Sequence, residues 1–123
     1  MTARLRIGSR GSRLALIQTD LVKTALVAAH PELGEPGAIE ILAIRTTGDR
    51  VQDRRLSEIG GKGLFTKEIE AALLEGRIDV GVHSMKDVET VIDARLAITA
   101  MLARDDPRDA LIAPQARVLA ALP

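Results

Sequence analysis

Polar and charged residues gather between positions 83 and 87, directly after a short apolar run. The run Ile78–Val82 predicts a buried strand, and it ends in His83-Ser84-Met85-Lys86-Asp87. A carboxylate beside a lysine at a strand end can hold or move a proton, or stabilise a developing cation. A helix cap or a structural ion pair is the other interpretation of the same residues. A single histidine is more often a satisfied core residue than a ligand, and the two histidines, His30 and His83, predict no metal site.

A second polar stretch, Ser9 to Ser12, lies where a strand is expected to lead into a helix. Ser12 is a natural N-cap, and the free N–H groups of a helix N-terminus favour an anion. Arg10 could add a bidentate contact to a carboxylate or phosphate. The alternative is an exposed arginine beside an ordinary serine cap.

A third stretch, Gly60-Gly61-Lys62-Gly63, lies in the long polar segment from residue 45 to residue 63. It is not a phosphate-binding P-loop, because Lys62 is followed by glycine rather than by serine or threonine. We expect a mobile lid that carries Lys62, since long loops in compact domains are often lids. A solvated, disordered loop is the other interpretation.

Strands and helices alternate around these three stretches. Apolar residues spaced near 3.6 predict one helix that begins after Ser12 and ends at His30, and a second over 64–75. Strands are expected over 4–8, 39–44, 78–82 and 96–102, and residues 110–113 could start one more. This alternation predicts an α/β fold with a mixed, mostly parallel sheet flanked by helices. Ligands bind beyond the carboxyl ends of such strands, where the three polar stretches lie.

Composition excludes several classes of protein. The chain has 123 residues with 17 basic and 17 acidic side chains, which argues against a nucleic-acid partner or an anionic-membrane binder. No apolar run approaches the roughly 20 residues that span a bilayer. The absence of cysteine excludes disulfides, thiolate metal sites and a cysteine nucleophile in this chain.

Five sequence blocks follow one another along the chain: Arg6 to Ser12, Thr46 to Asp49, Gly60 to Glu68, Val82 to Asp87 and Asp105 to Ala110. In order and spacing they resemble the porphobilinogen deaminase family, also called hydroxymethylbilane synthases. The resemblance implies one lobe of a fold like that of type II periplasmic binding proteins. Residues 1–103 would form an incomplete first domain, and residues 104–123 the crossover and the start of a second domain.

The resemblance also implies a chemistry. Family members are cytoplasmic transferases of tetrapyrrole and haem biosynthesis. They condense four porphobilinogen molecules into hydroxymethylbilane and release ammonia, on a dipyrromethane cofactor attached to a cysteine. By this resemblance Asp87 would be the catalytic carboxylate, which stabilises cationic pyrroles and assists proton transfer. The other implied roles are substrate binding by Arg10, Ser12, Gln18 and Phe65, cofactor binding by Ser84, Lys86 and Asp87, and a lid position for Lys62.

The chain departs from the family pattern in several ways. It has no cysteine to carry the cofactor, and the family's second and third domains lie outside the match. Glu89 and Asp93 would weaken the binding of polycarboxylates if they faced the site, and Arg13 and Glu58 are further departures. Three hypotheses follow: a first domain that is inactive alone, a stand-alone lobe that binds pyrrole carboxylates without catalysis, or an interaction module without a ligand. The expected ligands are porphobilinogen and polypyrrole intermediates. Family members are usually monomeric, but an isolated lobe is expected to self-associate through uncovered apolar surface.

Overall fold

A three-stranded parallel sheet organises the computed structural model, which describes residues 4–122. Strand β1 (Leu5–Ser9) lies in the centre, with β2 (Ile39–Ala43) on one side and β3 (Val80–Gly81) on the other. Both neighbours run parallel to β1, and Ile7 pairs with Ile41 and with Val80. The α/β class that the sequence predicts is therefore confirmed.

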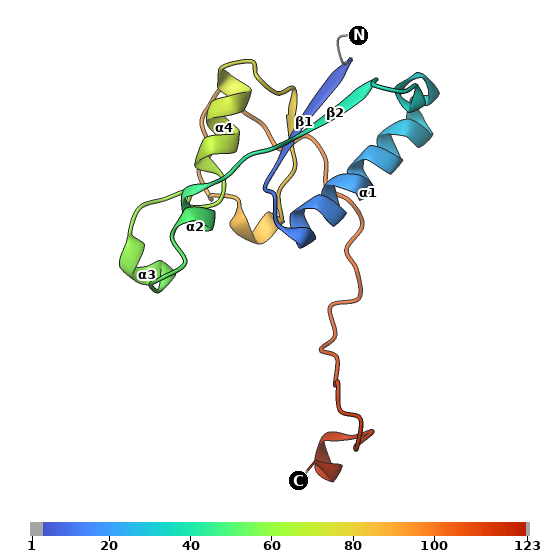
Figure 1. Cartoon of the computed structure of the whole chain (residues 1–123), viewed down its shortest axis with the longest axis vertical. Helices are drawn as coiled ribbons and strands as arrows, with labels where there is room; N and C mark the ends of the chain where they lie inside the picture. The colour runs from blue at the N-terminus through green and yellow to red at the C-terminus, as the bar shows by residue number, and fades with distance from the viewer. Residues whose placement is uncertain (1–3, 123) are drawn as a thin grey trace.

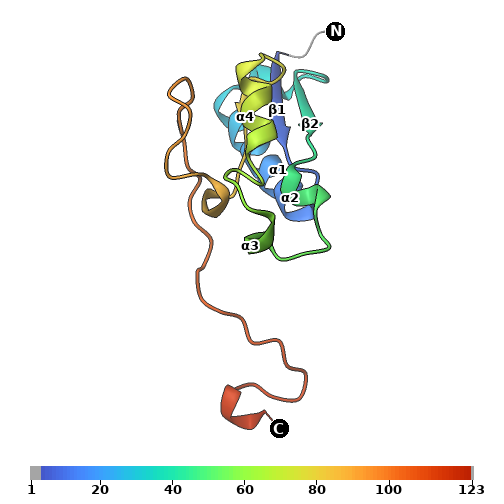
Figure 2. The same cartoon turned by 90° about the vertical axis from the view of Figure 1, so that its left-hand side faces the viewer.

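Two helices cover the two faces of this sheet (Figures 1 and 2). Helix α1 (Arg13–Ala29) connects β1 to β2, and helix α4 (Lys67–Leu74) precedes β3. The chain passes from β1 to β2 on one side and then crosses back past β1 to reach β3 on the other side. Because parallel crossovers are right-handed, the two helices end on opposite faces.

The core lies between the sheet and α4. Ile69 and Ala72 of α4 are fully buried against Ile78, and the partly buried Leu42, Ile44 and Leu73 pack around them. Strand β3 is therefore fixed to the body through the apolar residues beside it, although it is only two residues long. This packing positions the segment that follows β3.

Helix α1 is apolar on the side that faces away from the sheet. Leu14, Ile17 and Leu21, the residues whose spacing predicts the helix, are 55%, 51% and 53% exposed. The one fully buried residue of the helix among those described is Thr19, whose hydroxyl donates to the carbonyl of Ala15 at 2.8 Å. Periodicity thus predicts the helix correctly but does not say which face the sheet covers.

The segment after residue 87 differs most from the sequence predictions. The expected strand over 96–102 and the possible strand start over 110–113 are wrong, since neither range has regular structure and residues 97–112 are exposed. A strand needs a hydrogen-bonding partner, and none of the described residues offers one to these ranges. The polar segment 45–63 also has more structure than expected, with α2 (Thr47–Arg50) and α3 (Leu56–Ile59). A short 3₁₀ turn, η2 (Met85–Asp87), follows β3.

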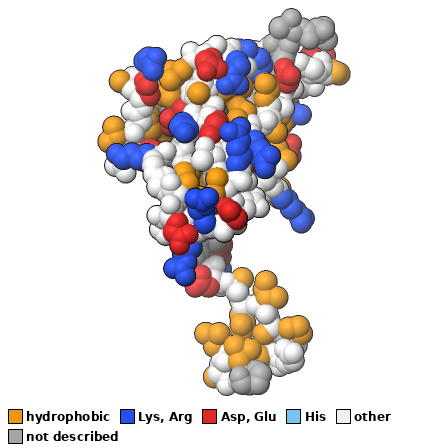
Figure 3. All heavy atoms as spheres, turned by 60° about the vertical axis from the view of Figure 1, so that its left-hand side comes forward, with side chains coloured by type: hydrophobic (Ala, Val, Ile, Leu, Met, Phe, Trp, Pro, Cys, Tyr) orange, Lys and Arg blue, Asp and Glu red, His pale blue; other side chains and the backbone are white. Residues whose placement is uncertain are grey.

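Residues 104–122 extend away from the body and end in the short 3₁₀ turn η3 (Leu119–Ala121) (Figures 1 and 2). Figure 3 shows that the far end of this segment carries mostly hydrophobic side chains. Ile112, Val118 and Leu119 are among its exposed apolar residues. The expected domain boundary between residues 103 and 104 stays a prediction.

Replacing Ser12 by alanine is expected to lower the free energy of unfolding by about 1 kcal/mol, because Ser12 caps α1. Its side-chain oxygen accepts a hydrogen bond from the backbone N–H of Ala15 at 3.4 Å. Urea denaturation of the 123-residue chain measures the effect. Ser12→Asp keeps a capping oxygen and should stay close to the original stability, whereas an unchanged Ser12→Ala variant would show that the cap contributes nothing.

Candidate functional site

A pocket of about 250 Å³ lies at the carboxyl ends of β1 and β3. Its walls come from the start of α1, from the segment after β3, and from the 45–65 segment. The lining residues are Arg10, Ser12, Leu14, Ala15, Gln18, Leu56, Phe65, Val82, His83, Ser84, Lys86 and Asp87. Their position matches the rule that ligands of parallel sheets bind beyond the carboxyl ends of the strands.

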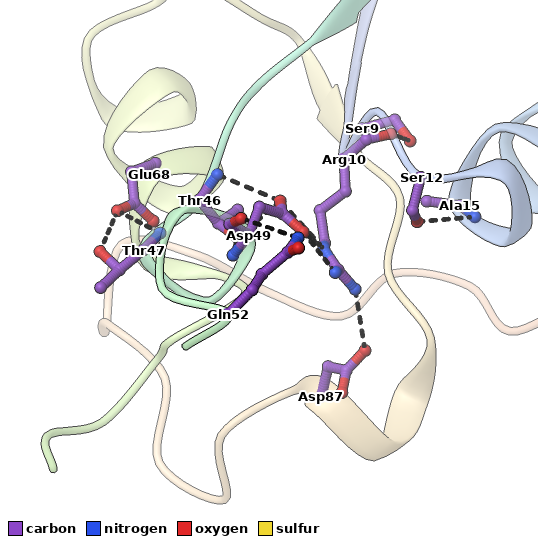
Figure 4. Close-up of polar contacts among 10 residues, drawn as sticks. All are labelled: Ser9, Arg10, Ser12, Ala15, Thr46, Thr47, Asp49, Gln52, Glu68 and Asp87. Atoms are coloured by element: carbon purple, nitrogen blue, oxygen red, sulfur yellow. Dashed lines mark hydrogen bonds and ion pairs between the residues drawn. The ribbon is translucent and has the colours of Figure 1, made fainter. Parts of the chain in front are cut away.

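Arg10 follows β1 directly and is contacted from three sides. Figure 4 shows its contacts with Asp49 and Asp87. Its Nε donates to Asp49 Oδ1 at 3.0 Å, and its Nη2 donates to the same oxygen at 2.5 Å. Its Nη1 lies 4.0 Å from Asp87 Oδ2. The guanidinium carbon lies 4.2 Å from the centre of the Phe65 ring, in a cation–π arrangement. The guanidinium plane is thus fixed by a carboxylate, an aromatic face and a second, more distant carboxylate.

Asp49 is itself held by the start of α2. Its Oδ2 accepts from the hydroxyl of Thr46 at 2.8 Å and from the backbone N–H of Thr46 at 3.2 Å, and the pair forms a capping box. Burial alone would raise the pKa of Asp49, but the hydrogen bonds from Arg10 and Thr46 outweigh it and lower that pKa below its usual value. The hydrogen bond to Asp49 likewise raises the pKa of Arg10. Both groups are therefore charged at neutral pH.

Phe65 rests directly on Gly48, in the middle of α2. A Cβ built on Gly48 would lie 2.3 Å from the Phe65 ring, so only glycine allows this contact. The backbone N–H of Gly48 donates to the carbonyl of Leu64 at 2.6 Å. Helix α2 and the start of the 64–74 segment therefore pack as one unit under the Arg10 side chain.

The 83–87 segment forms the opposite wall. The hydroxyl of Ser84 donates to Gln18 Oε1 at 2.8 Å, which joins this segment to α1. Burial lowers the pKa of His83, and the nearby Asp87 only partly offsets this, so His83 is neutral at pH 7. Lys86 is exposed and lines the pocket.

Seven of the eight site residues that the sequence predicts line this single pocket. They are Arg10, Ser12, Gln18, Phe65, Ser84, Lys86 and Asp87. Lys62 does not line it and is exposed on the loop before α4. Its expected lid position and the roles of the other residues stay predictions. Sequence reasoning missed the contact of Asp49 with Arg10, although the spacing of Thr46 and Asp49 signals a local cap.

Glu89 and Asp93 do not line the pocket. Glu89 Oε1 accepts from the backbone N–H of Gly63 at 2.5 Å, and Asp93 is paired with Arg95. The Gly63 contact ties the end of the polar loop to the segment that carries Asp87. These two carboxylates are therefore engaged by other groups of the chain and form no part of the pocket wall.

Replacing Glu89 by alanine is expected to speed hydrogen exchange of the Gly63 amide by about tenfold, because the amide loses a charged acceptor. Exchange measured by NMR on the 123-residue chain tests this. Glu89→Gln keeps a neutral acceptor and should fall between the two. Equal exchange rates in all three proteins would contradict the contact.

The pocket combines basic, acidic and neutral polar side chains. Arg10 and Lys86 are basic, and Ser12, Gln18 and Ser84 are neutral and polar, a combination that can hold a ligand with carboxylate groups. Asp87 places a carboxylate beside them, where it can stabilise positive charge or accept a proton. Among the described residues, no group of three or more His, Asp or Glu side chains could hold a metal ion.

The sequence matches one protein family and known proteins over nearly its whole length. The sequence model of one family, described as "Porphobilinogen deaminase, dipyromethane cofactor binding domain", matches residues 5–123. The chain is 56% identical over 119 residues to porphobilinogen deaminase, chloroplastic, of Oryza sativa subsp. japonica, which covers 97% of this chain and 33% of that protein. It is 52% identical over 122 residues to the protein of the same name from Pisum sativum, covering 99% of this chain and 33% of that protein.

The chain thus spans about a third of the length of these curated relatives. The word chloroplastic in both names describes the location of those relatives. The expected cytoplasmic location of this chain stays a prediction. Within residues 4–122 the structure has no helix that is long and apolar enough to cross a membrane.

Proposed function

The chain belongs to the porphobilinogen deaminase family, and from that premise we propose that it forms the substrate- and cofactor-binding lobe of a hydroxymethylbilane synthase. The reaction condenses four porphobilinogen molecules into hydroxymethylbilane with release of ammonia, in the cytoplasm. One observation carries the proposal: Arg10 and Asp87, which lie 77 positions apart in the sequence, face the same pocket with 4.0 Å between Nη1 and Oδ2. A cation for the substrate's carboxylate and a carboxylate for its reacting end therefore lie side by side.

In this proposal Arg10, Ser12 and Gln18 hold the acidic side chains of the incoming pyrrole. Phe65 packs against its ring. When the amine leaves, the pyrrole becomes a cation, and the Asp87 carboxylate stabilises that charge close to the pyrrole N–H. After the new carbon–carbon bond has formed, the attacking ring carries an extra proton on the carbon that made the bond, and the Asp87 carboxylate accepts that proton.

The donor set also fits the acidic side chains of the dipyrromethane cofactor after which the family's domain is described. Lys86 and Ser84 would hold its carboxylates, and Asp87 would face its pyrrole nitrogens. When bound, this group supplies the end to which pyrrole units are added. This chain has no cysteine, so the thiol that attaches the cofactor must come from another segment.

We infer that the 123 residues are inactive alone, with residues 1–103 as an incomplete first domain and residues 104–123 as the crossover and the start of a second domain. The chain's span of a third of its relatives supports this. A second candidate is a lobe that binds pyrrole carboxylates without catalysis. It is favoured by the fact that the pocket described here is formed entirely by residues 10–87 of this chain.

A chimera tests the proposal. The matched third of the Oryza sativa protein is replaced by this chain, and consumption of porphobilinogen is followed in the chimera and in the 123-residue chain. We expect turnover in the chimera and none in the isolated, folded chain. A folded chimera without turnover overturns the proposal, and porphobilinogen binding by the isolated chain would then favour the second candidate. Turnover by the isolated chain would contradict its inactivity alone.

A further inference from the structure

Asp49 approaches Arg10 from behind, on the side away from the pocket. It contacts Arg10 through Nε and Nη2, whereas Asp49 itself is absent from the pocket lining. The remaining nitrogen, Nη1, points toward Asp87 (Figure 4). The bidentate contact therefore occupies one edge of the guanidinium and leaves the other edge on the pocket side.

Asp49 is anchored independently of Arg10. Thr46, which donates two hydrogen bonds to Asp49, is fully buried, and helix α2 is joined to α4 by a second contact. In that contact Glu68 Oε1 accepts from the backbone N–H of Thr47 at 2.9 Å and from its hydroxyl at 2.5 Å. These contacts fix the position of the Asp49 carboxylate, so the Arg10 side chain takes the orientation that pairs with it.

A long arginine side chain loses considerable conformational entropy when it is immobilised. Arg10 has little of that freedom left, because Asp49 and the Phe65 face fix its guanidinium plane. A ligand carboxylate that binds Arg10 therefore does not have to immobilise the arginine side chain, and no conformational entropy of that side chain is lost on binding. Asp49 contacts Nε and Nη2, whereas Asp87 lies 4.0 Å from the third nitrogen, Nη1.

We propose that Asp49 is the positioning residue for Arg10: it presents the free edge of the guanidinium to the carboxylate of the substrate. This rests on the proposed function, because it takes the pyrrole carboxylate as the ligand of Arg10. Asp49 acts only through Arg10 and touches no substrate atom.

The chimera allows a direct test with four variants. Asp49→Asn keeps an oxygen for the Thr46 cap but removes the charge that orients Arg10, and we expect the KM for porphobilinogen to rise about tenfold with kcat little changed. Arg10→Lys should raise KM at least as much. The double variant should match Arg10→Lys alone, because Asp49 has nothing left to position.

Asp79→Asn is the matched control. Asp79 makes a bidentate pair of the same kind with Arg6, at 3.0 and 2.7 Å, outside the pocket. This variant should leave KM unchanged. A general structural defect would lower kcat through the active fraction instead of raising KM. An unchanged KM in Asp49→Asn, a lower KM, or additive losses in the double variant would each overturn the inference.

The activity of the chimera with the original sequence distinguishes a failure of the positioning role from a failure of the proposed function. An inactive chimera with the original sequence refutes the function, whereas an active one that tolerates Asp49→Asn refutes only the positioning role. The 123-residue chain provides a readout that needs no activity, the NMR signal of the Arg10 Nε–H. Slow exchange that is lost in Asp49→Asn but kept in Asp79→Asn supports the inference, and a signal unaffected by Asp49→Asn contradicts it.

Discussion

Replacing Asp87 by asparagine in the chimera is expected to lower kcat for porphobilinogen consumption by about 100-fold or more, the usual contribution of a positioned acid or base. Asparagine has nearly the same shape, so the pocket and the 3₁₀ turn at residues 85–87 should persist. It can neither accept the proton that the reaction releases nor balance the positive charge on a pyrrole. The loss should therefore appear in kcat, with KM changed much less.

A control variant and a check of folding accompany this prediction. Asp20→Asn, on the exposed side of α1, removes the same charge outside the pocket around Asp87 and should leave turnover unchanged. Circular dichroism and urea denaturation show whether each variant is folded. A folded Asp87→Asn chimera that retains a third or more of the original kcat would mean that the proton is taken by another group.

Replacing Gly48 by alanine is expected to destabilise the 123-residue chain by about 1–3 kcal/mol, the range seen when a packed contact is overfilled. The new Cβ would lie 2.3 Å from the ring of Phe65, and the ring has to move away. Phe65 supports the guanidinium of Arg10, so the variant should also lose the slow-exchanging Arg10 Nε–H signal. Urea denaturation and NMR on the same samples measure both effects.

The contact with Phe65 is the specific cause, and a second background isolates it. In a Phe65→Ala chain the ring is absent, and Gly48→Ala should then cost little or nothing further. Gly11→Ala serves as a control, since a Cβ there meets only Ala43 at 3.8 Å. If Gly48→Ala is equally costly with and without the Phe65 ring, the strain lies in the backbone of α2 instead.

Local patterns account for much of the fold. The 3.6-residue spacing and the Ser12 cap predict α1, and alternation of apolar runs with helices predicts the parallel sheet. These features depend on residues close in sequence, and capping and hydrophobic periodicity act over a few residues. The rule that polar residues at strand ends meet in one place also brings Arg10 and the 83–87 segment together correctly.

Other features required the tertiary structure. The strand expected over 96–102 has suitable residues but no neighbouring strand among those described, and β-structure is stable only when paired. Similarly, the apolar stripe through Leu14, Ile17 and Leu21 predicts a helix without showing which side is covered. Pairing and burial depend on elements far away in the sequence.

The amino-acid sequence by itself therefore determined the family, the α/β class and the residue types that line the pocket. Only the tertiary structure decided that Asp49, 39 positions from Arg10, holds its guanidinium, that Phe65 rests on Gly48, and that Lys62 lies outside the pocket. The physical reason is the range of the interactions. Propensities, caps and periodicity are properties of neighbouring residues, whereas hydrogen bonds and packing between distant segments exist only once the chain has folded.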